Sequence, residues 1–131
     1  MISRVGEAVS RYSAAAMKRE LSPRTIAFMT ANHPPPGTAI NPEAMMRMGS
    51  LMPGPEQGQG FGLGFAVRTD TGRNSLPGSP GEYYWVGAFG TSFWVDPKEK
   101  LIAVMMIQVP LMQSRYDRGL VRNLVYQAAT R

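Results

Sequence analysis

The chain has 131 residues, a formal net charge of +5 at pH 7 and no cysteine. This length suits one domain with a core, and the absence of cysteine excludes disulfides, thiolate catalysis and cysteine-based zinc sites. Binding to a phosphate backbone needs several cations on one face, and the basic residues here are scattered, so we expect no nucleic-acid partner. Only Arg115, Arg118 and Arg122 share a helix face, and a solvated helix surface explains them equally well.

Membrane and secretory signals are also missing from the printed sequence. No segment is long and apolar enough to span a bilayer, so we expect no membrane partner. The residues Met1–Glu7 contain no apolar stretch of the kind that marks a secretory signal. Cytoplasmic localisation is therefore the default expectation.

The first third of the chain predicts helices. Ala8–Glu20 is alanine-rich and favours a helix with a weak apolar face. Ser22 and Pro23 mark a clearer helix start, as N-cap and first helical residue, and Pro34–Pro36 end that helix. Its buried residues are expected to be Ile26, Phe28 and Met29. By the same capping argument, Asn41–Met48 predicts another short helix.

The second half of the chain predicts an antiparallel meander. Phe61–Arg68 alternates apolar and small residues, which indicates one strand. Glu82–Gly87 and Thr91–Val95 read as aromatic strands joined by a Gly-x-x-Gly bend. Asp96–Glu99 has the residues of a type I turn and predicts a hairpin. Leu101–Val109 is apolar on both sides, which favours a central position in the sheet.

A final helix should follow Pro110. Ser114–Asp117 is close to a capping box and would open this helix. The buried stripe is expected to be Leu120, Val121, Leu124, Val125 and Ala128. The order of elements predicts an α/β (α+β) fold, in which an antiparallel meander of about three to four strands packs against a C-terminal helix.

Three blocks carry a resemblance to a known family: Leu21–His33, Gly60–Val67 and Tyr84–Pro97. Together they resemble the C-terminal portion of the serine β-lactamase and penicillin-binding-protein-like superfamily, and in particular the class C β-lactamase-related esterases. The likeness covers residues 21–131, whereas residues 1–20 do not match. It implies a single partial domain, 1–131, whose strands are the last three of a five-stranded antiparallel sheet.

The resemblance also implies an active-site role for one segment. That family uses a Ser-x-x-Lys nucleophile, a Tyr-x-Asn base and a Lys-Thr-Gly-like triplet on an edge strand. The substrate-binding residues Trp85, Val86 and Gly87 stand in the place of the triplet, with Trp85 as a wall of the acyl pocket. The amide of Ala88 would then donate to the oxyanion. Val86 departs from the small or hydroxyl residue usual there, which suits an ester or amide substrate better than a β-lactam.

The other two motifs are absent, since no serine is followed three places later by lysine and no tyrosine or serine has asparagine two places on. Without an activated hydroxyl, acylation has no starting point, so we expect the chain alone to be inactive. Direct hydrolysis by the chain alone is a less favoured alternative. The second hypothesis, from a different class, is a non-catalytic interaction module that binds a partner through a sheet edge. The apolar Leu101–Val109 strand predicts a homo-oligomer or a complementing chain.

Other candidate residues have simpler interpretations. His33 lies beside three prolines and is expected at a loop surface, because no partner is spaced to orient it as a base. A methionine cluster, Met45, Met46, Met48 and Met52, favours gap filling over a lipophilic substrate mouth. No pair of carboxylates has the spacing of a metal or acid–base site, so neither metal nor cofactor is expected.

Overall fold

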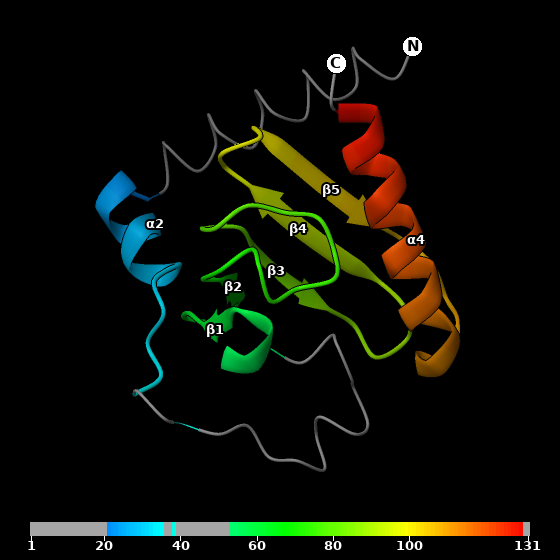
Figure 1. Cartoon of the computed structure of the whole chain (residues 1–131), viewed down its shortest axis with the longest axis horizontal. Helices are drawn as coiled ribbons and strands as arrows, with labels where there is room; N and C mark the ends of the chain where they lie inside the picture. Colours follow the sequence, from blue (N-terminus) through cyan, green and yellow to red (C-terminus); the bar gives the residue numbers. More distant parts are fainter. Residues whose placement is uncertain (1–20, 36–37, 39–52, 130–131) are drawn as a thin grey trace.

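A computed structural model of the chain describes residues 21–35, 38 and 53–129 (Figure 1). Within them, five strands form one antiparallel sheet in the order β1-β2-β3-β4-β5. The strands are β1 (Gln59–Phe61), β2 (Ala66–Arg68), β3 (Tyr83–Val86), β4 (Ser92–Asp96) and β5 (Leu101–Met105). The helical elements are α2 (Pro23–Met29), the 3-10 turn η2 (Pro55–Gln57) and α4 (Leu111–Ala129). The predicted α+β meander with a packed C-terminal helix is confirmed, with five strands instead of three to four.

The additional strand comes from a segment predicted as one strand. Phe61–Arg68 is divided into the end of β1 and all of β2, which pair antiparallel with Phe61 opposite Ala66. Between them, the Gly62 amide donates to the carbonyl of Phe65 at 2.8 Å. Gly64 adopts φ +92°, a left-handed conformation that glycine reaches without strain. The small residues between Phe61 and Phe65 therefore make a tight turn between two strands.

The β4–β5 hairpin agrees with the turn predicted from the sequence. The Asp96 carboxylate accepts hydrogen bonds from the backbone amides of Lys98 and Glu99, at 3.1 and 3.2 Å. These bonds hold the turn, so that Asp96 pairs with Leu101 at the start of β5.

The central position predicted for Leu101–Val109 is wrong for the described strands. β5 lies at the end of the sheet, pairs with β4 alone and stops at Met105. Beyond it, the amide of Val109 donates to the carbonyl of Phe89 in the β3–β4 connection, at 3.0 Å. The second half of the apolar run thus contacts the end of the neighbouring hairpin and does not extend the strand.

Helix α2 begins as predicted and packs less deeply than predicted. Ser22 is the N-cap and accepts from the amide of Thr25, with Pro23 at the first position. No residue of α2 is buried, and Phe28 is 61% exposed. The helix contacts the sheet at its C-terminal end. There the Leu63 amide of the β1–β2 turn donates to the carbonyl of Met29 at 2.8 Å.

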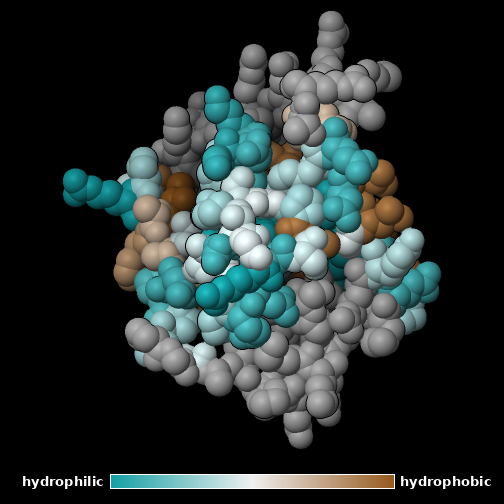
Figure 2. Space-filling view, viewed as in Figure 1, coloured by the Kyte–Doolittle hydropathy of each residue, from teal (hydrophilic) through white to brown (hydrophobic). Residues whose placement is uncertain are grey.

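Helix α4 lies across one face of the sheet (Figure 1). It begins at Leu111, directly after the proline, so the predicted capping box falls inside the helix and Ser114 is fully buried. Val121 and Val125 pack against the core as predicted. The remaining three predicted members, Leu120, Leu124 and Ala128, are exposed instead. Figure 2 shows brown surface on the right, where α4 lies in Figure 1.

Some predictions fall outside the described residues. These are the helices predicted at 8–20 and 41–48 and the methionine cluster of residues 45–52. In the part of the chain that the structure describes, no helix combines the length and apolarity needed to cross a membrane.

Candidate active-site edge

The two faces of the sheet carry different side chains near the end of β3. Tyr84 packs in the core with Ala66 and Trp94, on the α4 side. Since side chains alternate along a strand, Trp85 projects from the opposite face. Its ring contacts that of Phe61 edge-on at 5.4 Å and is 36% exposed.

The predicted site residues therefore do not all point in the same direction. Val86 is half-buried and packs against the core on the α4 side. Its side chain therefore lies on the opposite side of the sheet from that of Trp85. Trp85 faces away from α4, and Ala88, two residues after the strand ends, is exposed.

Residues Gly87–Thr91, here called the β3–β4 bend, connect the two aromatic strands. The Gly87 amide donates to the Thr91 carbonyl at 2.7 Å, and the Gly90 amide donates to the Gly87 carbonyl at 3.2 Å. Gly90 has φ +108°, and a Cβ there would lie 2.9 Å from Ile107. A Cβ on Gly87 would overlap the Thr91 hydroxyl. Both glycines are thus required by the bend itself.

An arginine from α4 binds this bend from the core side. The Arg118 guanidinium donates from Nη2 to the carbonyls of Gly87 and Thr91, at 2.5 and 3.1 Å, and from Nε to that of Gly90 at 3.3 Å. Arg118 is only 5% exposed, and burial lowers the pKa of its guanidinium, although an arginine remains charged at neutral pH.

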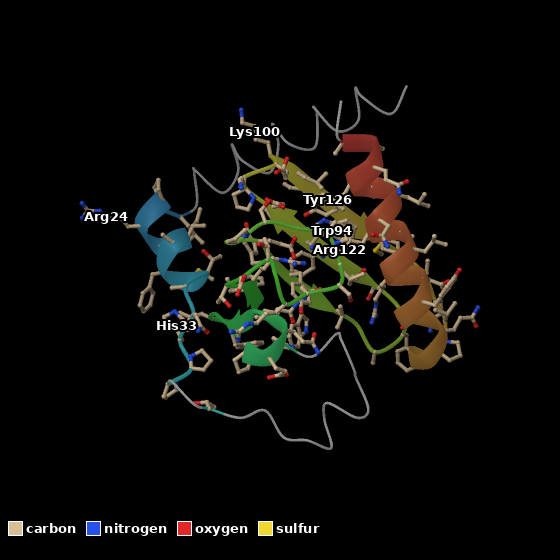
Figure 3. The ribbon with its side chains drawn as sticks, in the orientation of Figure 1. Arg24, His33, Trp94, Lys100, Arg122 and Tyr126 are labelled. Carbon is tan, nitrogen blue, oxygen red and sulfur yellow. The ribbon has the colours of Figure 1, made fainter. Side chains whose placement is uncertain are left out.

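The neighbouring arginine of α4 joins a buried ionic network. Arg122 forms an ion pair with Glu82, and its Nε donates to the Pro77 carbonyl at 2.7 Å. Arg68 lies 3.6 Å from the other oxygen of Glu82. Side chains of Arg122, Trp94 and Tyr126 lie together between the sheet and α4 in Figure 3, with the guanidinium 5.1 Å from the Trp94 ring centroid.

Tyr126 connects this network to the β4–β5 turn. Its hydroxyl lies 2.8 Å from an Asp96 oxygen and 3.0 Å from a Glu82 oxygen. The two carboxylates therefore share the hydroxyl of Tyr126 as a hydrogen-bond donor. Burial, together with the nearby charge of Glu82, raises the pKa of Tyr126. Burial acts to raise the pKa of Asp96 too, but hydrogen bonds from Tyr126, Glu99 and Ser79 outweigh it and leave that pKa lowered.

Sequence reasoning placed Arg118 and Arg122 on a solvated face, and the structure corrects this: both are buried. The signal that could have found them is their spacing. Ser114, Arg118 and Arg122 recur every four residues, and Val121 and Val125 lie on the same side of the helix, so the arginines belong to the buried stripe.

The structure also describes His33 and several of the acidic residues. His33 is exposed beside the end of α2 (Figure 3), and its Nε2 lies 2.7 Å from the Phe28 carbonyl. Among the described residues, no group of three or more His, Cys, Asp or Glu side chains could hold a metal ion.

Comparison with known proteins agrees with this architecture. The Beta-lactamase family model matches residues 12–126, so the chain belongs to the β-lactamase family, whose members share a serine-hydrolase-like fold. Two curated relatives from Mycobacterium tuberculosis also match: "Uncharacterized protein MT1414" of strain CDC 1551 / Oshkosh and "Protein Rv1367c" of strain ATCC 25618 / H37Rv. Each is 41% identical over 54 residues, which are 39% of this chain and 14% of the relative. The chain thus matches about one-seventh of the length of these relatives.

Proposed function

We propose that this chain supplies one wall of the substrate cleft of a β-lactamase-related serine hydrolase of the esterase kind. In this proposal, Trp85 lines the acyl pocket, the backbone at Val86 and Gly87 borders the substrate, and the Ala88 amide donates to the oxyanion. The nucleophilic serine, its lysine and the tyrosine base come from another part of a longer protein or from a complementing chain. The chain alone is then inactive.

The observation that carries the proposal is the division of side chains at the end of β3. Val86 packs toward α4, whereas Trp85 projects from the other face and the Ala88 backbone follows at an exposed position. An aromatic wall and an accessible amide beyond a strand end can contact the same carbonyl group. Donors aimed at the charge that develops in acyl transfer supply a large share of rate enhancement, about 3 kcal/mol for a single donor.

The family membership and the short overlap with the relatives support the need for a second part. The matched segment covers 14% of each relative, and no Ser-x-x-Lys occurs in the 131 residues of this chain. The substrate class in the proposal is a small ester or amide, and it rests on the family resemblance, because the Val86 side chain packs toward α4 and not toward the proposed cleft.

The test is complementation. The chain is incubated with a chromogenic short-chain ester and a fluorophosphonate probe, alone and mixed with an N-terminal piece of a related enzyme. Turnover in the mixture, with none from either part alone, is the expected result. Turnover by the chain alone would contradict the proposal, as would the absence of turnover with several such pieces.

The second candidate function is a non-catalytic module that binds a partner through a sheet edge. It is favoured by β5, which pairs with β4 alone among the described strands and carries Val104 at 63% exposure. An unpaired apolar edge is a template for another strand. Complementation distinguishes the cases: no turnover with several N-terminal pieces would favour the module, and turnover in the mixture would favour the hydrolase.

A further inference from the structure

We propose that Arg118 is the positioning residue that fixes the direction of the Ala88 amide. The inference concerns the geometry of the β3–β4 bend, and its catalytic meaning rests on the proposed function. It assigns a task to a buried side chain on α4 that lies on the far side of the sheet from Trp85.

The contacts of Arg118 are directed at backbone oxygens. Three carbonyls of the bend, those of Gly87, Gly90 and Thr91, accept from one guanidinium at 2.5–3.3 Å. Hydrogen bonds from a charged donor are about twice as strong as neutral ones, and the planar fork of arginine constrains several acceptors together.

These contacts determine the orientation of the next peptide unit. In a planar trans peptide, the carbonyl of one residue and the amide of the following residue point in opposite directions. The Gly87 carbonyl points to Arg118, which reaches it from α4. The Ala88 amide must therefore point away from α4, out of the core.

Because residue 87 is a glycine, the orientation of the 87–88 peptide depends on hydrogen bonds such as those from Arg118. Gly87 lacks a Cβ, and backbone rotations that a larger residue resists are open to it. Rotation of the 87–88 peptide would remove the Gly87 carbonyl from both Arg118 and the Gly90 amide, and would turn an N–H toward a guanidinium that is only a donor. Arg118 thus stabilises the orientation in which Ala88 donates outward.

The helix also provides a matched control. Arg122 lies one turn further along α4 and is equally buried, at 7% exposure compared with 5%. Its partners are Pro77 and Glu82, and none lies in the bend. Loss of either arginine should destabilise the fold, but only loss of Arg118 should release the bend.

The test measures the bend directly by NMR. In the wild-type chain, through-hydrogen-bond couplings should connect the Arg118 guanidinium nitrogens to the carbonyl carbons of Gly87, Gly90 or Thr91. In Arg118→Gln, the Ala88 amide resonance should shift or split and exchange its hydrogen at an altered rate. In Arg122→Gln, it should stay at its wild-type position while resonances near Glu82 move.

Two results would overturn the inference: wild-type couplings that are absent, or an Ala88 resonance that moves equally in Arg118→Gln and Arg122→Gln. The wild-type measurement remains decisive if Arg118→Gln does not fold. Arg118→Lys keeps the charge and loses the fork, so it should give an intermediate shift.

The catalytic consequence is measured separately, in the complemented mixture. Arg118→Gln should lower kcat by up to about 10²-fold with little change in KM, because the donor acts on the transition state. An NMR effect without any change in kcat would refute the role of Ala88 in the proposed function and leave the positioning of its amide intact. A kcat loss without an NMR effect would refute the positioning role.

Discussion

The two faces of the sheet differ in what covers them. The α4 face is covered by aromatic stacking, three buried arginines (Arg68, Arg118 and Arg122) and a network of carboxylates, with Trp94 only 4% exposed. The opposite face carries Trp85 at 36% and Val104 at 63% exposure. Two tryptophans on adjacent strands thus have different surroundings. Among the described residues, the α4 face therefore holds the more completely buried of the two tryptophans, and the other face holds the more exposed one.

The largest effect is expected from the ionic network on the α4 face. Glu82→Ala would leave Arg68 and Arg122 buried without their shared carboxylate. Removing one partner of a buried ion pair costs about 3–5 kcal/mol, so the free energy of unfolding should fall by that amount. Urea denaturation provides the measurement, with exposed Glu56→Ala as the control that should leave it unchanged. Equal stabilities for the two variants would mean that the α4 face is not held by this network.

The stability losses of two tryptophan variants, one on each face of the sheet, compare the two faces directly. Trp94→Ala should lower the free energy of unfolding by about 3–5 kcal/mol, because it empties a packed site in the core. Trp85→Ala should lower it by less, about 1–3 kcal/mol, because its ring is partly in solvent. Thermal or urea unfolding of both variants gives the difference. A larger loss for Trp85 would reverse the assignment of the two faces.

A smaller effect is expected where the two faces meet, in the β3–β4 bend. Gly87→Val places a side chain against the Thr91 hydroxyl and should cost about 1–3 kcal/mol. The double variant with Thr91→Ala should recover part of this loss, because the clash is with that side chain. Denaturation of the single and double variants measures the recovery. Additive losses would show that the strain has another source.

The smallest effect is a pH dependence on the α4 face. The lowered pKa of Asp96 means that its carboxylate stabilises the folded state above the ordinary aspartate pKa of 3.8. This contribution should be lost as the pH falls through the folded-state pKa. The stability difference between the wild type and Asp96→Asn should therefore be largest near neutral pH and shrink below about pH 4. A difference that grows on acidification would contradict this.

Local signals explain which parts of the fold the sequence predicted. The Ser22 cap and the Asp96 turn depend on neighbours within three residues, and both were found as expected. The four-residue spacing indicates which side of α4 carries Arg118, but the partners of Arg118 are carbonyls 27 to 31 positions away, which no local pattern contains. Leu120 and Leu124 were expected to be buried, but they lie on the exposed side of α4, and the opposite side, which carries Arg118 and Arg122, packs against the sheet.

The candidate site was recognised through a family likeness of Trp85–Ala88, and the sequence could not give its orientation. Strand register decides that Val86 faces α4 while Trp85 does not, and register follows from pairing with β4. The exposed position of Ala88 also depends on the conformation of the β3–β4 bend, which Arg118 of α4 stabilises.

The most direct test of the account is the rate of ester turnover in the complemented mixture with the Ala88 amide removed. Ala88→Pro deletes the donor, whereas Ala88→Gly retains it and controls for the lost methyl group. We predict that the proline variant lowers kcat by about 10²–10³-fold and that the glycine variant stays near the wild type. Equal kcat values for the proline and glycine variants, with both bound to the complementing piece, would contradict the central claim that the backbone after β3 contributes an oxyanion donor.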